Sequence, residues 1–386
     1  MHTPRTPSLR LVTGVPLRAL LIVLITACAG ATPSSDPAPV AARTPGGGAT
    51  APNGAPPLIQ SVWPVRTQEH LDLWLHGYAM INPDTTLVPY FRRGYRERVG
   101  AIRRQRGVST LLDSNRDRLL ACIAIQPSLA TSGQFLPLYF TSWEQMHQVI
   151  DQFLGGDGSP ASARDQATAS YFAILGSSFQ SPEDREWLRL FTASVDDEGK
   201  RFYHDYWTTE LRARATVVSH VDSLWQRQWR PALQRFLNNT QQQNGQLFLS
   251  LPLGGEGRTV QLARNEYAIA GAMPESIAES EVALYVLAHE ATGSIASAAI
   301  ADNTTPADRR AGIGSRFDQA AAVRAGALLL EKTIPSALPG YMRFYLQSAG
   351  RSAPTDARAA FVAAFSIPDA LRNAISRQID VVLGGI

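Results

Sequence analysis

The sequence predicts a mainly α-helical protein with a small antiparallel β-sheet, an α+β fold. Long stretches have helical periodicity, and one short region after residue 246 has leucine at every second position. Of the 386 residues, 45% are hydrophobic and 18% are charged. The chain can therefore bury a large core, which excludes disorder along its whole length. Its two cysteines exclude a disulfide-rich miniprotein and a Cys-rich zinc module.

The first residues have the features of an export signal. Arg5, Arg10 and Arg18 precede an apolar run over residues 19–25, which is too short for a permanent membrane span. Small residues then lead to Cys28. A positive segment, a short apolar segment and small residues before a cleavage site are typical of a secretory signal.

The segment Ile25-Thr26-Ala27-Cys28 resembles the lipobox of bacterial lipoproteins. The resemblance implies that residues 1–27 are removed and that Cys28 carries the lipid that anchors the protein to a membrane. Ala29 follows, where an Asp would retain many lipoproteins at the inner membrane, so the expected location is the periplasmic side of an outer membrane, if the cell has one. Residues 28–57 are rich in Pro, Ala and Gly and predict a flexible tether.

Removing the signal also changes the charge balance. The whole chain has 36 basic and 33 acidic residues, and the signal holds three of the basic ones and no acidic one. The mature chain is therefore neutral by this count, and its bulk charge does not favour an anionic partner.

Residues 58–240 predict a helical domain. Aromatic residues recur at helical spacing after residue 183 and predict a core stripe. Ser181 and Pro182 are typical of a helix start, while Gly199 and Pro231 indicate that the long segment is divided. The expected helices span 68–81, 86–106, 114–125, 141–154, 164–177 and 182 onward.

An arginine-rich segment lies within this domain. Arg92, Arg96 and Arg103 share one helical face by spacing. For a tethered protein, this face predicts either contact with anionic lipid head groups or a solvated surface with a few ion pairs. Nucleic acid is not an expected partner of an exported protein.

Residues 241–386 predict a small sheet followed by helices. Alternating residues indicate strands over 247–253, 258–263 and 265–270, and residues 254–257 indicate a turn between them. The glycines of this turn do not have the spacing of a phosphate-binding loop. The expected later helices span 315–333, 338–349, 354–365 and 367–383.

A capping box at Ser276 and Glu279 opens a predicted helix over 276–302. The helix is apolar all round before it reaches His289 and Glu290, so both ionisable side chains are expected to be buried. Burial of such groups is costly unless they are paired or bind a ligand. The small residues from Gly293 onward predict close packing of another helix rather than an open cleft.

A buried helix that carries His-Glu beside a small sheet resembles the active-site helix of gluzincin-type zinc metallopeptidases. The resemblance covers residues 246–346. It implies that His289 is a zinc ligand, Glu290 the general base and Glu331 a further ligand, and that Tyr341 or Tyr345 lies near the oxyanion. The family has a second zinc-binding His at the position of Gly293, so the site is expected to be incomplete, with zinc possible but not required.

Three hypotheses about function remain open. The first is a lipid-anchored envelope protein with a metallopeptidase-like core that binds a peptide or an envelope protein without cleaving it. The second is an active zinc-dependent hydrolase with His289 and Glu331 as ligands and Glu290 as the base. The third is a non-catalytic helical scaffold, in which His289 and Glu290 form a buried hydrogen-bonded pair.

Overall fold

The computed structural model of the protein describes residues 62–81 and 86–384. The signal, Cys28 and the tether lie outside these residues. The described residues belong to one compact unit. Strand β1 (Val65–Arg66), near its start, pairs with β2 (Asn244–Ser250) through Val65 and Leu247. The predicted parts 58–240 and 241–386 therefore contribute strands to one sheet.

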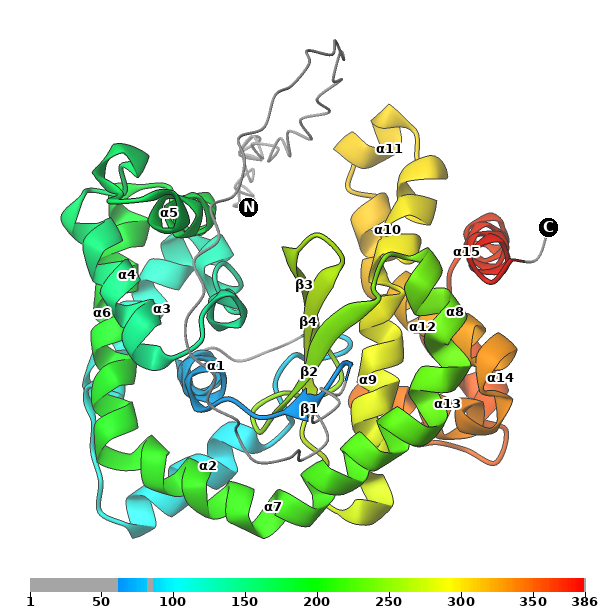
Figure 1. Ribbon diagram of the computed structural model, residues 1–386, viewed down its shortest axis with the longest axis horizontal. Helices are drawn as coiled ribbons and strands as arrows, with labels where there is room; N and C mark the ends of the chain where they lie inside the picture. The colour runs from blue at the N-terminus through cyan, green and yellow to red at the C-terminus, as the bar shows by residue number, and fades with distance from the viewer. Residues whose placement is uncertain (1–61, 82–85, 385–386) are drawn as a thin grey trace, which may run out of the picture. The chain divides into compact units, whose positions relative to one another are not determined.

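Helices on one side of the sheet form the first part of this unit (Figure 1). They are α1 (Glu69–Ile81), α2 (Tyr95–Gln105), α3 (Leu111–Ile125), α4 (Trp143–Gly155) and α5 (Gln166–Ser178), with short 3₁₀ turns at Pro127–Ala130, Leu136–Tyr139 and Pro160–Ser162. Most bounds agree with the sequence prediction. The helix predicted from residue 86 instead begins at Tyr95, directly after Gly94, whose φ of 74° lies in the left-handed region.

A continuous helical run then crosses from one side of the sheet to the other (Figure 1). It consists of α6 (Pro182–Glu198), a π-helical turn at Gly199–Tyr203, α7 (His204–Leu224), a second π-helical turn at Trp225–Trp229 and α8 (Arg230–Asn239). The aromatic stripe on this run is confirmed as core, with Trp187, Phe191 and Trp225 at most 1% exposed. Gly199 begins the first π-helical turn, and Pro231 lies just after the second, so neither residue breaks the helical run.

The sheet is small, as predicted, but it is mixed rather than wholly antiparallel. Its order is β1-β2-β4-β3, where β3 spans Arg258–Ala263 and β4 spans Glu266–Ala272. β3 and β4 pair antiparallel as expected, while β2 runs parallel to both β1 and β4. After β2 the chain crosses to the far edge of the sheet and forms β3 there. It then turns back as β4, which lies between β3 and β2 and therefore runs parallel to β2.

Helices of the C-terminal part pack on the other side of the sheet (Figure 1). They are α9 (Glu281–Ala291), α10 (Gly293–Asp302), α11 (Pro306–Arg310), α12 (Asp318–Thr333), α13 (Leu338–Ser348), α14 (Ala357–Ala364) and α15 (Asp369–Val382), with 3₁₀ turns at Ile277–Glu279, Gly314–Arg316 and Pro335–Ala337. One hydrophobic cluster extends through both groups of helices and the sheet.

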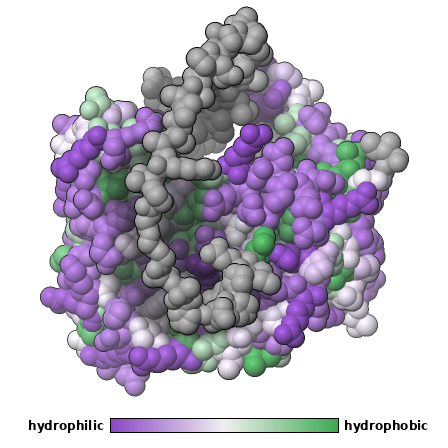
Figure 2. Space-filling model, viewed as in Figure 1, coloured by the Kyte–Doolittle hydropathy of each residue, from purple (hydrophilic) through white to green (hydrophobic). Residues whose placement is uncertain are grey.

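Within the described residues, no helix combines the length and the apolar character that a membrane span requires. In the view of Figure 2, hydrophilic residues cover most of the visible surface, and hydrophobic residues show in separate patches.

Candidate functional site

Helix α9 carries His289 and Glu290 into the interior. Residues 283–289 are all buried, as expected for a helix that is apolar on every side. The predicted helix over 276–302 is interrupted immediately after this pair. The Thr292 hydroxyl donates to the carbonyl oxygens of Ala288 and His289, at 3.0 Å each, and α10 starts at Gly293. A hydroxyl that bonds back to the preceding turn bends a helix, so the pair lies next to a bend.

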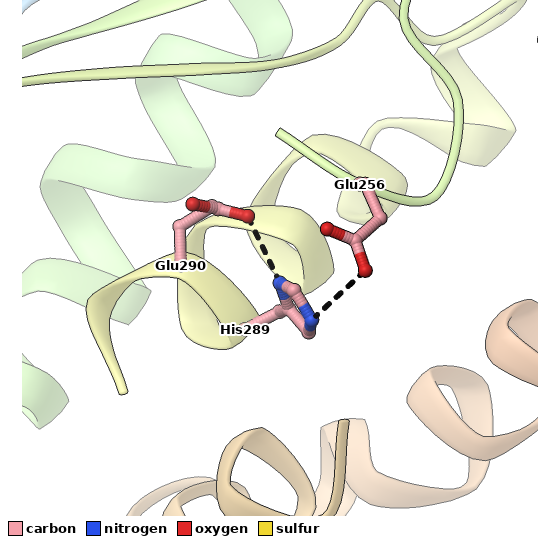
Figure 3. Close-up of side chains that lie close together, drawn as sticks. All are labelled: Glu256, His289 and Glu290. Atoms are coloured by element: carbon pink, nitrogen blue, oxygen red, sulfur yellow. Dashed lines mark hydrogen bonds and ion pairs between the residues drawn. The ribbon is translucent and has the colours of Figure 1, made fainter. Parts of the chain in front are cut away.

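Two carboxylates flank the His289 imidazole (Figure 3). Its Nδ1 lies 3.0 Å from Glu290 Oε1, and its Nε2 lies 4.0 Å from Glu256 Oε1. The first distance is that of a hydrogen bond, and the second is too long for one. Nε2 is buried and has no hydrogen-bond partner among the described residues. One ligand atom from each of the three residues lies within 4.8 Å of the others. We call Glu256, His289 and Glu290 the acidic-histidine cluster.

Glu256 reaches the cluster on the loop between β2 and β3. Most of residues 251–257 are buried, which is unusual for a connection. Gly257 holds the loop against the sheet, because a Cβ at this position would lie 2.1 Å from the carbonyl oxygen of Ala270. The Gly257 N–H donates to Glu290 Oε1 at 3.1 Å. The same Glu290 oxygen thus binds both the loop and the His289 ring.

The cluster favours a charged imidazole. Burial alone would lower the pKa of His289, but the hydrogen bond to Glu290 and the negative charges of Glu256 and Glu290 outweigh it and raise that pKa above 6.5. Asp318 lines the same cavity, and burial raises its pKa. Within the cluster the two carboxylates of Glu256 and Glu290 outnumber the single imidazole, so the cluster itself suits a cation better than an anion.

A cavity of about 640 Å³ opens over the cluster. Besides the cluster itself, it is lined by β3, by the start of α10 and by the start of α12. At one side, the Arg258 guanidinium lies over the rings of Tyr90 and Phe135 and donates to the Tyr90 hydroxyl at 3.2 Å. Since β3 is the edge strand on this side of the sheet, the cavity adjoins a strand that is paired on one side only.

Gly293 and its neighbours face this cavity instead of another helix. Gly293, Ser294 and Ser297 line it, and a Cβ added at Gly293 would meet no atom within 4 Å. The prediction that small residues here allow a close helix contact is wrong for these positions. Room for a larger side chain exists where the gluzincin family has its second His.

The other predicted site residues do not join the cluster. The Glu331 carboxylate lies at the surface and accepts a hydrogen bond from Arg358 at 2.6 Å. Tyr345 stacks on the His289 ring with centroids 5.4 Å apart, and Tyr341 donates to the Val323 carbonyl oxygen at 2.8 Å. Burial raises the pKa of both tyrosines well above 10, and neither lines the cavity. Tyr345 therefore packs against the His289 ring, and Tyr341 packs against Tyr345.

The predicted arginine face is not formed by one helix, because Arg92 precedes α2 and Arg103 is buried. Arg103 is only 8% exposed, because it donates to the fully buried carboxylate of Glu198 at 2.9 and 3.0 Å. It therefore cannot contact a lipid surface. Arg92 is partly buried and paired with Glu275, while Arg96 is half-buried beside Glu97.

Sequence reasoning missed Glu256. The available signal was a single acidic residue among three glycines, within an otherwise apolar stretch that follows a strand. We expected this stretch to be a turn, and it lies in a buried loop. Comparison of the chain with protein-family models, curated protein sequences and solved structures found no match.

Proposed function

We propose that the protein is a lipid-anchored envelope protein that binds a divalent ion of the zinc class at the acidic-histidine cluster. In this proposal it holds an extended peptide segment beside the ion without cleaving it. His289 Nε2 and the Glu256 carboxylate are the protein ligands, and Glu290 orients the imidazole through Nδ1.

The gap between His289 Nε2 and Glu256 Oε1 carries this proposal. Zinc bonds imidazole nitrogen and carboxylate oxygen at about 2.0–2.2 Å, so two donors on a tetrahedral ion lie about 3.3–3.6 Å apart. The 4.0 Å separation is too wide for a hydrogen bond and exceeds that spacing by only about half an ångström. A carboxylate on the other ring nitrogen is the usual partner of a metal-binding histidine, and Glu290 occupies that place.

The edge strand supports a peptide as the ligand. β3 pairs only with β4, and its residues Arg258, Thr259 and Gln261 line the cavity. An extended chain that adds to such an edge forms main-chain hydrogen bonds and places alternate side chains in the neighbouring cavity.

The position of Glu290 argues against cleavage. A catalytic zinc site usually has three protein ligands and an open position, whereas Gly293 offers no ligand and Glu331 is at the surface. Glu290 Oε1 is engaged by His289 and by the Gly257 N–H, so it holds the ring and the loop instead of facing a bound water.

Zinc titration of the chelator-treated protein by calorimetry tests the proposal. We expect one ion per chain, with binding at least about tenfold weaker in His289→Ala and Glu256→Gln because each removes one of two ligands. Glu290→Gln should weaken binding by about 10–100-fold, as for other residues that orient a metal ligand. Glu331→Gln is the matched control, since its carboxylate lies outside the cluster, and its affinity should equal that of the unchanged protein.

Absence of stoichiometric zinc, or equal affinity in Glu256→Gln, would contradict the metal site and favour the scaffold hypothesis.

Incubation of the zinc-loaded protein with a mixture of unfolded peptides, followed by mass spectrometry, tests whether the protein holds a peptide without cleaving it. Retained and intact peptides are expected. Cleavage that disappears in Glu290→Gln would favour the hydrolase hypothesis.

A further inference from the structure

Arg258 brings a positive charge to the cavity at the acidic-histidine cluster. It is the first residue of the edge strand β3, and it lines the cavity. It directly follows Gly257, whose N–H binds Glu290, and it comes two residues after Glu256. A ligand that reaches the cluster therefore lies in the same cavity as this charge.

Aromatic rings hold the Arg258 side chain in place. The carbon at the centre of its guanidinium lies 5.8 Å from the centre of the Tyr90 ring and 5.4 Å from that of Phe135. The two rings are themselves neighbours, with centroids 5.7 Å apart. Aromatic faces attract a cation but do not neutralise it. The guanidinium is therefore positioned by these rings and keeps its full charge.

The charge of Arg258 has no carboxylate partner within the described part of the chain. Among these residues, its guanidinium makes one hydrogen bond, to the Tyr90 hydroxyl at 3.2 Å, and no carboxylate lies within ion-pair distance of it. A guanidinium has five N–H donors, and Arg258 is exposed. Most of its donors are therefore open to a ligand.

Other polar atoms around the cavity also lack partners. Gln242 and Thr259 both line the cavity, and among the described residues nothing hydrogen-bonds to the buried Gln242 Oε1 or Thr259 Oγ1. The orientation of the Gln242 amide is fixed, because its Nε2 donates to the Ala291 carbonyl oxygen at 3.2 Å. Buried polar groups are ordinarily hydrogen-bonded. A polar ligand in this cavity would gain hydrogen bonds that the protein itself leaves open.

We propose that Arg258 binds a carboxylate of the peptide that occupies the cavity. This role rests on the proposed function, because it requires a peptide beside the metal site. The planar fork of a guanidinium matches the two oxygens of a carboxylate. A zinc ion at the cluster offsets the negative charges of Glu256 and Glu290, which otherwise repel a further carboxylate. Binding of an acidic peptide should therefore depend on zinc more strongly than binding of a neutral one.

The carboxylate could be the C-terminus of the peptide or an Asp or Glu side chain, and two forms of a random peptide library separate these sources. One form has a free C-terminal carboxylate and the other has a C-terminal amide. Each is incubated with the zinc-loaded protein, and the retained peptides are identified by mass spectrometry. Retention of the free form about tenfold above the amide identifies the C-terminus. Equal retention of the two forms, with Asp and Glu enriched about tenfold over Asn and Gln, identifies a side chain.

Variants of Arg258 test the assignment. Arg258→Gln should abolish the carboxylate preference without weakening zinc binding, and zinc titration of this variant also shows whether the site is folded. Arg258→Lys keeps the charge but loses the planar fork, so it should reduce the preference only in part. Arg264→Gln is the matched control, because Arg264 is an exposed arginine in the turn after β3 and does not line the cavity. It should leave the preference unchanged.

Two kinds of result overturn the role of Arg258. Equal retention of acidic and neutral peptides, or a carboxylate preference that persists in Arg258→Gln, overturns it and leaves the metal site and peptide binding in place. Retention of no peptide in either form overturns it together with the peptide part of the proposed function. In that case the metal site still stands or falls by zinc titration alone.

Discussion

At the scale of single residues, burial decides the chemistry of the ionisable groups. Asp72 on α1 is fully buried, and its Oδ2 accepts hydrogen bonds from Trp207 Nε1 at 2.9 Å and from the Leu251 N–H at 3.3 Å. Burial raises its pKa from 3.8 to about 7, although hydrogen bonds and the charge of Arg92 act in the opposite direction. This carboxyl group therefore titrates near neutral pH.

The raised pKa of Asp72 predicts a pH-dependent stability. Between pH 4 and 7 the folded protein holds a proton that the unfolded chain has released, so the free energy of unfolding should fall as pH rises across this range, by roughly 4 kcal/mol at most, and then level off. Asp72→Asn cannot ionise and should lose this decline. Urea unfolding at pH 5 and pH 8 measures it, with the exposed Asp302→Asn as control. Parallel pH profiles for Asp72→Asn and the unchanged protein would contradict the assignment.

The sequence allowed only part of the site to be predicted at this scale. His289 and Glu290 are recognisable because they are adjacent and the helix before them is apolar. Glu256 is 33 positions earlier, and its approach depends on the path of a loop that no local pattern encodes. Arg103 looked like a surface residue because its partner, Glu198, is 95 positions away.

At the scale of elements, helical periodicity predicted most helices to within a few residues, and alternation located the three longer strands. Neither pattern identifies which strand lies beside which. The parallel contact between β2 and β4 depends on how residues 251–257 pass the sheet, which is a property of packing. The same loop carries Glu256 to the cluster. The wrong prediction of a wholly antiparallel sheet and the failure to predict Glu256 therefore have one cause, the path of this loop.

Two glycines at the cavity should respond oppositely to the same substitution. Gly257→Ala places a Cβ 2.1 Å from a backbone oxygen of β4 and should destabilise the protein by roughly 1–3 kcal/mol. It should also weaken zinc binding, because the loop carries Glu256. Gly293→Ala has open space within a helix and should be neutral or stabilising by up to about 1 kcal/mol. Urea unfolding measures both variants, and equal destabilisation by the two would contradict the assigned role of Gly257.

At the scale of the whole molecule, the resemblance to bacterial lipoproteins concerns a part of the chain that the structure does not describe. The lipobox and the folded unit are separated by residues 29–57. Lipid attachment and folding should therefore be separable by mutation, since the proposed anchor is a single thiol before the tether.

Replacement of that thiol tests the anchor directly. Cys28→Ser should move the protein from the detergent-soluble membrane fraction to the soluble fraction, and its mass should show no acyl groups. Cys122→Ser is the matched control, because Cys122 packs against the core within α3, and this variant should remain in the membrane fraction. A membrane-bound, unmodified Cys28→Ser protein would show that another segment provides the attachment.

The pairing of β1 with β2 also has a consequence for the time course of folding. Trp63 donates to the Gln242 carbonyl oxygen, and Asp72 accepts from the Leu251 N–H, so each contact joins residues 179 positions apart. At a synthesis rate of roughly 5–20 residues per second, the partner of each segment emerges about 10–40 s later. During that interval Trp63 and Asp72 lack these partners, while α1 can already pack against α2 and α3. β1 can pair with β2 only after about two thirds of the chain has emerged, so the N-terminal helices can form before the sheet that joins them to the C-terminal part.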